Sequence, residues 1–163
     1  MNEQMSRTVA REIALHMIFA EVFAGYGDGF EEFFLSEDNF ASLAEEHKLY
    51  RTLPDEIQRL YICRLYSGVC GHMSELDTYI EKYARGWQFG RISRPAIAIL
   101  RLSMYEILYM EDIPNGASIN ECVDFSREYD CEEASAFVNG VLSAFLRNEY
   151  EALHVPRNGV EPE

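Results

Sequence analysis

The chain has 163 residues, 48% of them hydrophobic, which is enough for one packed domain or for two small bundles that share a core. Its formal net charge of −14 excludes nonspecific binding of nucleic acid or anionic membrane by the whole surface. The charge is unevenly distributed, because residues 57–105 carry seven basic and three acidic side chains while both flanking parts are strongly acidic. Residues 57–105 are called the basic island below.

The cysteine pattern and the N-terminal sequence indicate the cellular compartment in which the protein is found. The four cysteines form no C-x-x-C pair, and residues 1–12 contain no apolar segment of the kind found in signal peptides. No other stretch is long enough to span a membrane. These features predict a reduced, cytoplasmic protein without a signal peptide.

Helical spacing of apolar residues runs through the whole chain, and strand alternation is not seen. In chain order, the expected helices cover residues 6–25, 30–35, 40–47, 57–72, 74–83, 96–110, 118–129 and 132–150. Residues 30–35 and 40–47 are expected to be either two short helices or one broken helix. Residues 84–92, which include Trp87, are expected to form a connection. Pro54 with the acids after it is typical of a helix start, and Gly25 and its neighbours are typical of a helix end.

The stretch 96–110, AIAILRLSMYEILYM, is apolar except for Arg101, Ser103 and Glu106. A helix that is apolar on nearly every side belongs in the centre of a protein or in a membrane, and fifteen residues are too few for a membrane span. We therefore expect a central buried helix with Ser93 near its N-cap and Pro95 in its first turn. Pro114 and the following Asn115-Gly116 are expected to end it.

The pattern as a whole predicts an all-α fold. About seven helices are expected to form two packed helical bundles around the central apolar helix. We expect residues 1–152 to form a single helical domain and residues 153–163 to be a flexible tail. Gly140 interrupts the last helix, and we expect it to allow close approach to the central helix.

Signals for catalysis or for metal and cofactor binding are poor. The four histidines are scattered, and Cys63 and Cys70 lack two further ligands at zinc-binding spacing. The G-x-G-x-G at residues 25–29 follows a helix instead of a strand, so it fails the test for a phosphate-binding loop. RNA binding has some physical support, because the basic island includes Trp87 and Phe89, and single strands are held by base stacking plus basic groups.

Five stretches, in order, resemble the NusB family of bacterial transcription antitermination factors. They are residues 6–15 (SRTVAREIAL), Trp87 with Arg91, residues 99–107 (ILRLSMYEI), residues 113–123 (IPNGASINECV) and residues 137–142 (FVNGVL). The resemblance covers about residues 6–147. It implies an all-helical fold of two packed bundles and no enzyme activity.

The resemblance also implies partners and site residues. Family members pair with NusE, a small-subunit ribosomal protein, and bind the boxA element of nascent, single-stranded RNA within the antitermination complex of RNA polymerase, supporting ribosomal RNA synthesis. By position, it implies RNA-binding roles for Arg7, Arg11, Phe19 and Phe137. It further implies a structural signature made of Arg101, Glu106, Asn120, Glu121, Asn139 and Gly140. Arg101 and Glu106 are expected to be buried and bonded to neighbouring helices, with the 120–121 segment as a candidate partner of Arg101.

Alternatives stay open from the sequence. Thr8 and Val9 stand where the family often has arginine, so a protein-interaction module with weak or no RNA binding of its own is the second hypothesis. The same helical module also occurs at the N-terminus of some ribosomal RNA cytosine methyltransferases. Formation of a homodimer is a further open alternative.

Overall fold

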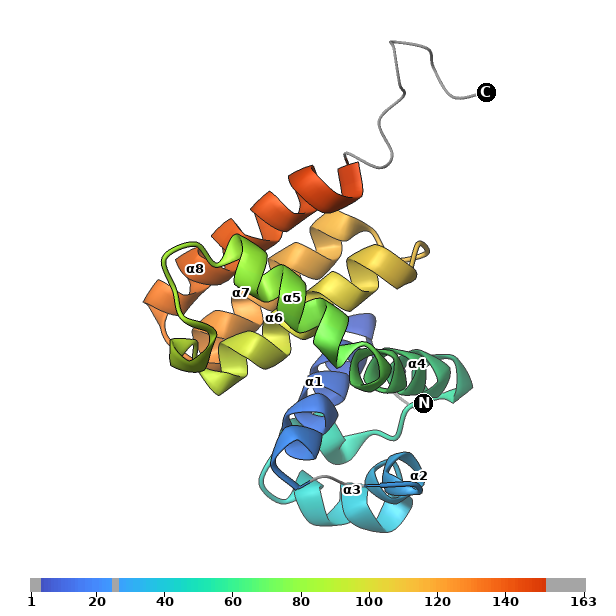
Figure 1. The fold of residues 1–163 in the computed structure, drawn as a ribbon. Coiled ribbons are helices and arrows are strands. Elements are labelled where there is room, and N and C mark those ends of the chain that lie inside the picture. Colours follow the sequence, from blue (N-terminus) through green and yellow to red (C-terminus); the bar gives the residue numbers. More distant parts are fainter. Residues whose placement is uncertain (1–3, 25–26, 152–163) are drawn as a thin grey trace, which may run out of the picture. The chain divides into compact units, whose positions relative to one another are not determined.

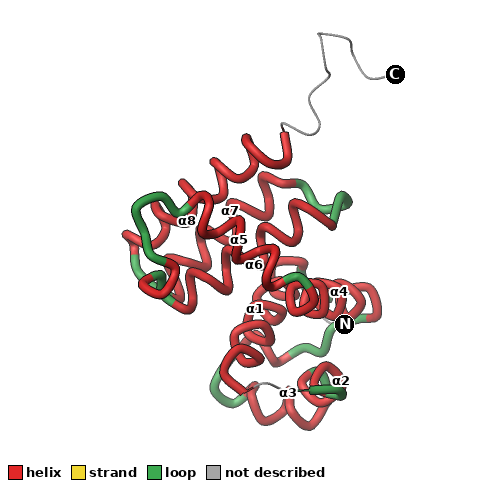
Figure 2. The backbone as a smooth tube through the Cα atoms, viewed as in Figure 1, coloured by secondary structure: helices red, strands yellow, loops and turns green. Residues whose placement is uncertain are grey.

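The computed structural model describes residues 4–24 and 27–151, and helix is the only regular structure among them (Figures 1 and 2). The α-helices are α1 (Arg7–Ala24), α2 (Phe30–Phe34), α3 (Glu37–Ala44), α4 (Glu56–Gly71), α5 (Met73–Tyr83), α6 (Arg94–Tyr109), α7 (Asn115–Tyr129) and α8 (Glu132–Phe145). Short 3-10 turns form at η1 (Lys48–Arg51) and η2 (Phe89–Arg91), and a π-helical turn, η3 (Leu146–Glu151), continues α8. The chain divides into two compact units, unit 1 (Met1–His72) and unit 2 (Met73–Glu163).

The predicted all-α class is confirmed, and the differences lie at helix ends. Helix α3 begins three residues earlier than expected because the Ser36 hydroxyl accepts a hydrogen bond from the Asn39 amide, 3.2 Å away. Helix α7 also begins three residues early. Pro114 is its N-cap, so Asn115 and Gly116 form its first turn instead of closing off the preceding helix. The predicted tail at residues 153–163 lies outside the described residues, and one domain over residues 1–152 stays a prediction.

In unit 1, the long helices α1 and α4 pack against each other. Their contact buries apolar side chains such as Ile13, Met17, Ile62 and Leu65, all fully enclosed. Asp55 caps α4 by accepting a hydrogen bond of 2.8 Å from the Gln58 amide, as the Pro-acid start signal predicts. The unit is therefore built on one helix pair, with the shorter helices attached to it.

Helix α6 is the centre of unit 2, because it packs against α5, α7 and α8. Eleven of its sixteen residues are buried. The Ser93 hydroxyl accepts a hydrogen bond of 3.2 Å from the Ala96 amide, and Pro95 sits in the first turn. The predictions of a buried apolar helix, of its N-cap and of its proline are confirmed. The arrangement of two bundles around this helix stays a prediction.

Burial of α6 forces its polar side chains to find partners within the protein. Arg101, 7% exposed, donates to both carboxylate oxygens of Asp77 on α5, at 2.7 and 2.9 Å. The expected bonding to a neighbouring helix is confirmed, but the 120–121 segment on α7 was the wrong candidate for Arg101. Asp77 can offer a bidentate carboxylate that matches the planar guanidinium, and α5 packs directly on α6.

A second buried polar chain links α6 to α7. The Ser118 hydroxyl donates to the carboxylate of Glu106 at 3.0 Å, and the Ser103 hydroxyl lies 2.9 Å from that of Ser118. Because Ser118 gives its proton to Glu106, Ser103 donates to Ser118. Glu106 and both serines are buried, so this chain fixes the pairing of the two helices.

His16 is the titratable group in unit 1 whose burial has the clearest consequence for stability. Its Nδ1 lies 2.5 Å from the Tyr50 hydroxyl, and its ring centroid lies 5.3 Å from that of His47. Burial, and secondly the neighbouring His47, lower the pKa of His16 from 6.5 to about 4. The folded protein therefore holds His16 neutral at pH values where the unfolded chain has already protonated it.

We predict that Asp77→Ala lowers the free energy of unfolding by about 2–3 kcal/mol, because it leaves the buried Arg101 guanidinium without its carboxylate. Urea denaturation measures the change. The matched control is Asp124→Ala, which removes one of the two carboxylate partners of the exposed Arg127, the other being Glu132, and should cost less than about 1 kcal/mol. Equal losses in the two variants would contradict a special role for the buried pair.

We also predict that wild-type stability falls relative to His16→Gln as the pH is lowered. The contribution of neutral His16 is complete above pH 6.5 and is lost as the pH falls towards 4, because only the unfolded chain takes up a proton in that window. The free energy of unfolding of the wild type, minus that of His16→Gln, should fall by roughly 3 kcal/mol over this range. Glutamine keeps a hydrogen-bonding group near Tyr50, and parallel stability curves would show that His16 does not cause the effect.

Candidate nucleic-acid interface

The two N-terminal arginines lie four residues apart on α1, so they share one face of the helix. The Arg7 guanidinium carbon stands 4.0 Å from the centre of the Tyr61 ring of α4, and that of Arg11 stands 5.7 Å from it. Both are cation–π distances. Tyr61 thus fixes the position of Arg7, which stays partly exposed.

Arg11 and Phe19 occupy different environments from Arg7. Arg11 is only 2% exposed, so its guanidinium is not available on the surface of the described structure. Phe19 is partly exposed on the last third of α1. Of the predicted contacts on α1, the structure therefore leaves Arg7 and Phe19 accessible.

The fourth predicted contact, Phe137, is partly exposed on α8 and is brought against Trp87 of the connection between α5 and α6. Their ring centroids are 5.1 Å apart and their planes are inclined by 50°. Trp87 is 55% exposed. The FVNGVL motif at residues 137–142 placed Phe137 among the predicted RNA contacts. Trp87 was not among them, although the sequence analysis linked the aromatic residues of the basic island, including Trp87, to base stacking.

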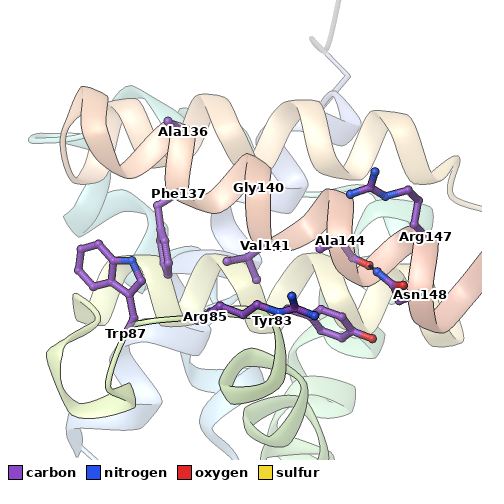
Figure 3. A pocket seen from close by; sticks show the side chains of 11 residues that line it. Tyr83, Arg85, Trp87, Ala136, Phe137, Gly140, Val141, Ala144, Arg147 and Asn148 are labelled. Carbon is purple, nitrogen blue, oxygen red and sulfur yellow. Dashed lines mark hydrogen bonds between the residues drawn. The ribbon is translucent and has the colours of Figure 1, made fainter.

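Beside this aromatic pair runs a hollow of about 390 Å³ between α8 and the start of the connection. Figure 3 shows Trp87 and Phe137 towards one end of this stretch of α8, and Arg147 and Asn148 towards the other. Arg85 also lines the hollow, and none of its lining residues is acidic. This is an aromatic and basic surface on an acidic chain, and it lies within unit 2. It is called the α8 hollow below.

Gly140 lines the α8 hollow, and the expectation that it packs closely against the central helix was wrong. Gly140 is exposed, and a Cβ atom built on it would meet nothing within 4 Å. The residues of α8 that face the core are larger ones, including Val138, Val141 and Phe145. Nothing in the packing of the described residues requires a glycine here.

A second, polar hollow lies between α7 and α8, and Asn120 and Asn139 line it. Both asparagines are exposed, and Glu121 beside Asn120 is partly exposed. Of the six residues of the predicted signature, only Arg101 and Glu106 are therefore buried. The asparagine amides offer donors and acceptors to an outside ligand.

Signals for other kinds of site are missing from residues 4–24 and 27–151. No three His, Cys, Asp or Glu side chains there are placed to hold a metal ion. No helix in the same ranges is long and apolar enough to cross a membrane. The hollows described above are open to the surface and are lined by aromatic, arginine and amide groups. Together with the fold, they define the class of protein as an all-helical binding protein.

Comparisons with known proteins specify this class. The NusB family model matches residues 8–147. The transcription antitermination protein NusB of Agathobacter rectalis is 36% identical over 141 residues, which cover 86% of this chain and 99% of the relative. The chain belongs to the NusB family. The prediction that the chain is not an enzyme is confirmed, because the relatives that it matches over nearly their full length are transcription antitermination proteins.

Solved structures agree with the fold. NusB of T. maritima has a TM-score of 0.69 at 24% identity, covering 94% of this chain and all of that one. A chain in the crystal structure of the antitermination factors NusB and NusE in complex with dsRNA has a TM-score of 0.67 at 26% identity. That likeness covers 86% of this chain and 96% of the other.

We predict that Gly140→Ala raises the free energy of unfolding by up to about 1 kcal/mol, because alanine is the better helix former and the added methyl group meets open space. Thermal and urea denaturation measure the gain. Gly86→Ala is the contrasting variant. Gly86 has a φ of +81°, a conformation that costs alanine about 1–2 kcal/mol, so that variant should be destabilised. A destabilised Gly140→Ala protein would mean that the space above Gly140 is filled.

Proposed function

We propose that the chain acts in transcription antitermination by binding boxA-type single-stranded RNA together with NusE, and so supports ribosomal RNA transcription. The observation that carries the proposal is the likeness to the NusB chain found with NusE and dsRNA, which extends over most of both chains. The role belongs to the antitermination complex of RNA polymerase. It implies a cytoplasmic location, in keeping with relatives that are bacterial transcription factors.

The charge of the chain supports binding as a complex. A net charge of −14 repels a polyanion at long range, and a basic partner would offset this repulsion. Local basic and aromatic groups then supply the contacts. Arg7, steadied on Tyr61, is suited to a phosphate, while Phe19 and Phe137 are suited to bases. The buried Arg11 would support α1 and Tyr61 instead of touching phosphate.

The second candidate is a module that binds NusE and has little affinity for RNA. The burial of Arg11 favours it, because that burial leaves Arg7 as the one accessible arginine of the N-terminal pair. A gel-shift assay separates the two candidates. The proposal expects a shift of boxA-type RNA by the chain with NusE, and a weaker shift of scrambled RNA. A stable complex with NusE that shifts neither RNA would support the second candidate.

We predict that Arg7→Gln weakens RNA binding by the complex with NusE and flattens its salt dependence. Loss of one phosphate contact to a single strand should reduce the slope of log K against log salt by about 0.7. Arg51→Gln is the charge-matched control, since Arg51 is exposed in the same unit but on η1, and its slope should match that of the wild type. An unchanged slope in Arg7→Gln would exclude Arg7 as a phosphate ligand.

A further inference from the structure

Helix α4 of unit 1 carries a continuous exposed stripe. Starting just before the helix, positions at alternating intervals of four and three residues are all exposed: Leu53, Ile57, Leu60, Arg64, Ser67 and Gly71. This spacing puts the five helical positions on one face, and it is the spacing at which one helix packs along another. The six positions are called the α4 stripe below.

The first half of the α4 stripe is apolar. Ile57 is 67% exposed, Leu60 66% and Leu53 40%. The other exposed large hydrophobic side chains in the described part of the chain, Phe33, Trp87 and Tyr109, lie on separate elements. Single apolar side chains on a surface are ordinary, whereas several on one helix face are typical of a surface that binds a partner.

The α4 stripe is separate from the core face of the same helix. The core face carries Ile62, Leu65 and Val69, which are fully enclosed, and α4 packs against α1. Helix α4 therefore has one apolar face that the protein covers and a second that the described residues leave exposed. A second apolar face on a helix is expected to be covered by a further element.

The size of the side chains along the stripe suits a helix as the covering element. Ser67 and Gly71 are small, and a Cβ atom built on Gly71 would meet nothing within 4 Å. A partner backbone can approach closely at this end of α4, and it must leave room for Ile57 and Leu60 at the other. The face from Ile57 to Gly71 rises about 21 Å, or four turns of a partner helix. An extended strand repeats every two residues and does not match this spacing.

Arg64 specifies the charge in the centre of the partner. It is exposed in the middle of the α4 stripe, so a docked helix would enclose its side chain. Enclosing a guanidinium is costly unless a carboxylate pairs with it. The partner helix therefore needs an Asp or Glu among its apolar residues, opposite Arg64.

One flank of the stripe is acidic. Arg59 donates a hydrogen bond of 3.3 Å to the Leu35 carbonyl, and the Cys63 thiol is hydrogen-bonded to the Glu31 carboxylate, so α2 and the residue after it lie along this flank. Residues 28–46 carry seven acidic and no basic side chains. Basic side chains on the partner helix would be attracted to this flank.

We propose that the α4 stripe docks an amphipathic helix of a partner protein other than NusE, with a carboxylate opposite Arg64 and basic residues towards α2. A second copy of this chain fits poorly, because the stripe contains no carboxylate to meet Arg64 and each copy carries a net charge of −14. NusE serves the proposed function by bringing positive charge, whereas the centre of the stripe requires a negative group.

The test uses a designed peptide as the probe. It is a labelled amphipathic helix of about three heptads, with isoleucine and leucine in the seam, glutamate at the central seam position and lysine on one flank. A second peptide has lysine in place of the central glutamate. Fluorescence anisotropy follows each peptide as the full chain is added. The glutamate peptide should bind roughly tenfold or more tightly than the lysine peptide. Equal binding of the two peptides, or no binding of either, would overturn the inference.

Variants locate the bound peptide. Leu60→Glu should weaken binding by roughly tenfold or more, because it puts a charge into the apolar half of the stripe. Phe33→Glu is the matched control, since it makes the same change at an exposed hydrophobic position of unit 1 outside the stripe, and it should not weaken binding. Both side chains are exposed, so urea denaturation should give the same midpoint as for the wild type. Equal effects of the two variants would overturn the inference.

A charge exchange at Arg64 gives the sharpest result. Arg64→Glu should weaken binding of the glutamate peptide and restore binding of the lysine peptide. Such a rescue cannot come from misfolding. An Arg64→Glu protein that binds both peptides as the wild type does would show that the peptide lies elsewhere.

The competing occupants are tested with the same protein. Sedimentation velocity should show no self-association through the stripe, and the peptide should bind equally well when NusE is already bound. Dimers that Leu60→Glu dissociates would identify a second copy as the occupant and overturn the inference. Displacement of the peptide by NusE would overturn it as well. None of these measurements contains RNA, so their failure leaves the proposed function standing.

Discussion

Burial of α6 is the constraint on which unit 2 depends. A helix enclosed by α5, α7 and α8 must satisfy every polar group it carries, and it does so through the pair of Arg101 with Asp77 and the chain from Ser103 through Ser118 to Glu106. Apolar contacts alone tolerate sliding, whereas these polar contacts are directional. They set which residues of α5 and α7 lie against α6.

The outer surface of α8 follows from this arrangement. Its inner face, with Val138, Val141, Leu142 and Phe145, packs towards the core and contacts α6. The opposite face therefore carries Asn139 and Gly140, and Phe137 reaches the connection that precedes α6. Trp87 meets Phe137 because that connection begins at the end of α5, which also packs on α8. A rigid core thus places an aromatic and basic surface at one site on an acidic protein.

The arginines fall into two groups, those that are buried within the fold and those that are accessible at the surface. Arg101 is paired and enclosed, and Arg11 is enclosed near Tyr61. Arg7, Arg85 and Arg147 keep part of their surface accessible. The distribution of charge along the chain identified the basic island. It could not separate buried, structural arginines from accessible ones, because the environment of each arginine depends on neighbours distant in sequence. The island's Arg101 supports the fold, while Arg147 lies outside the island and still joins Arg85 in one hollow.

The sequence by itself determined what local rules govern. Apolar spacing predicted the helices, and Ser93 and Asp55 marked two helix starts, because an N-cap hydrogen bond joins residues only three apart. The ordered motifs also fixed the family. The tertiary structure alone decided that Arg101 pairs with Asp77, that Trp87 lies against Phe137, that Arg11 is buried and that Gly140 faces open space. Each of these depends on which helices meet and at what rotation, which the spacing of residues within one helix does not specify.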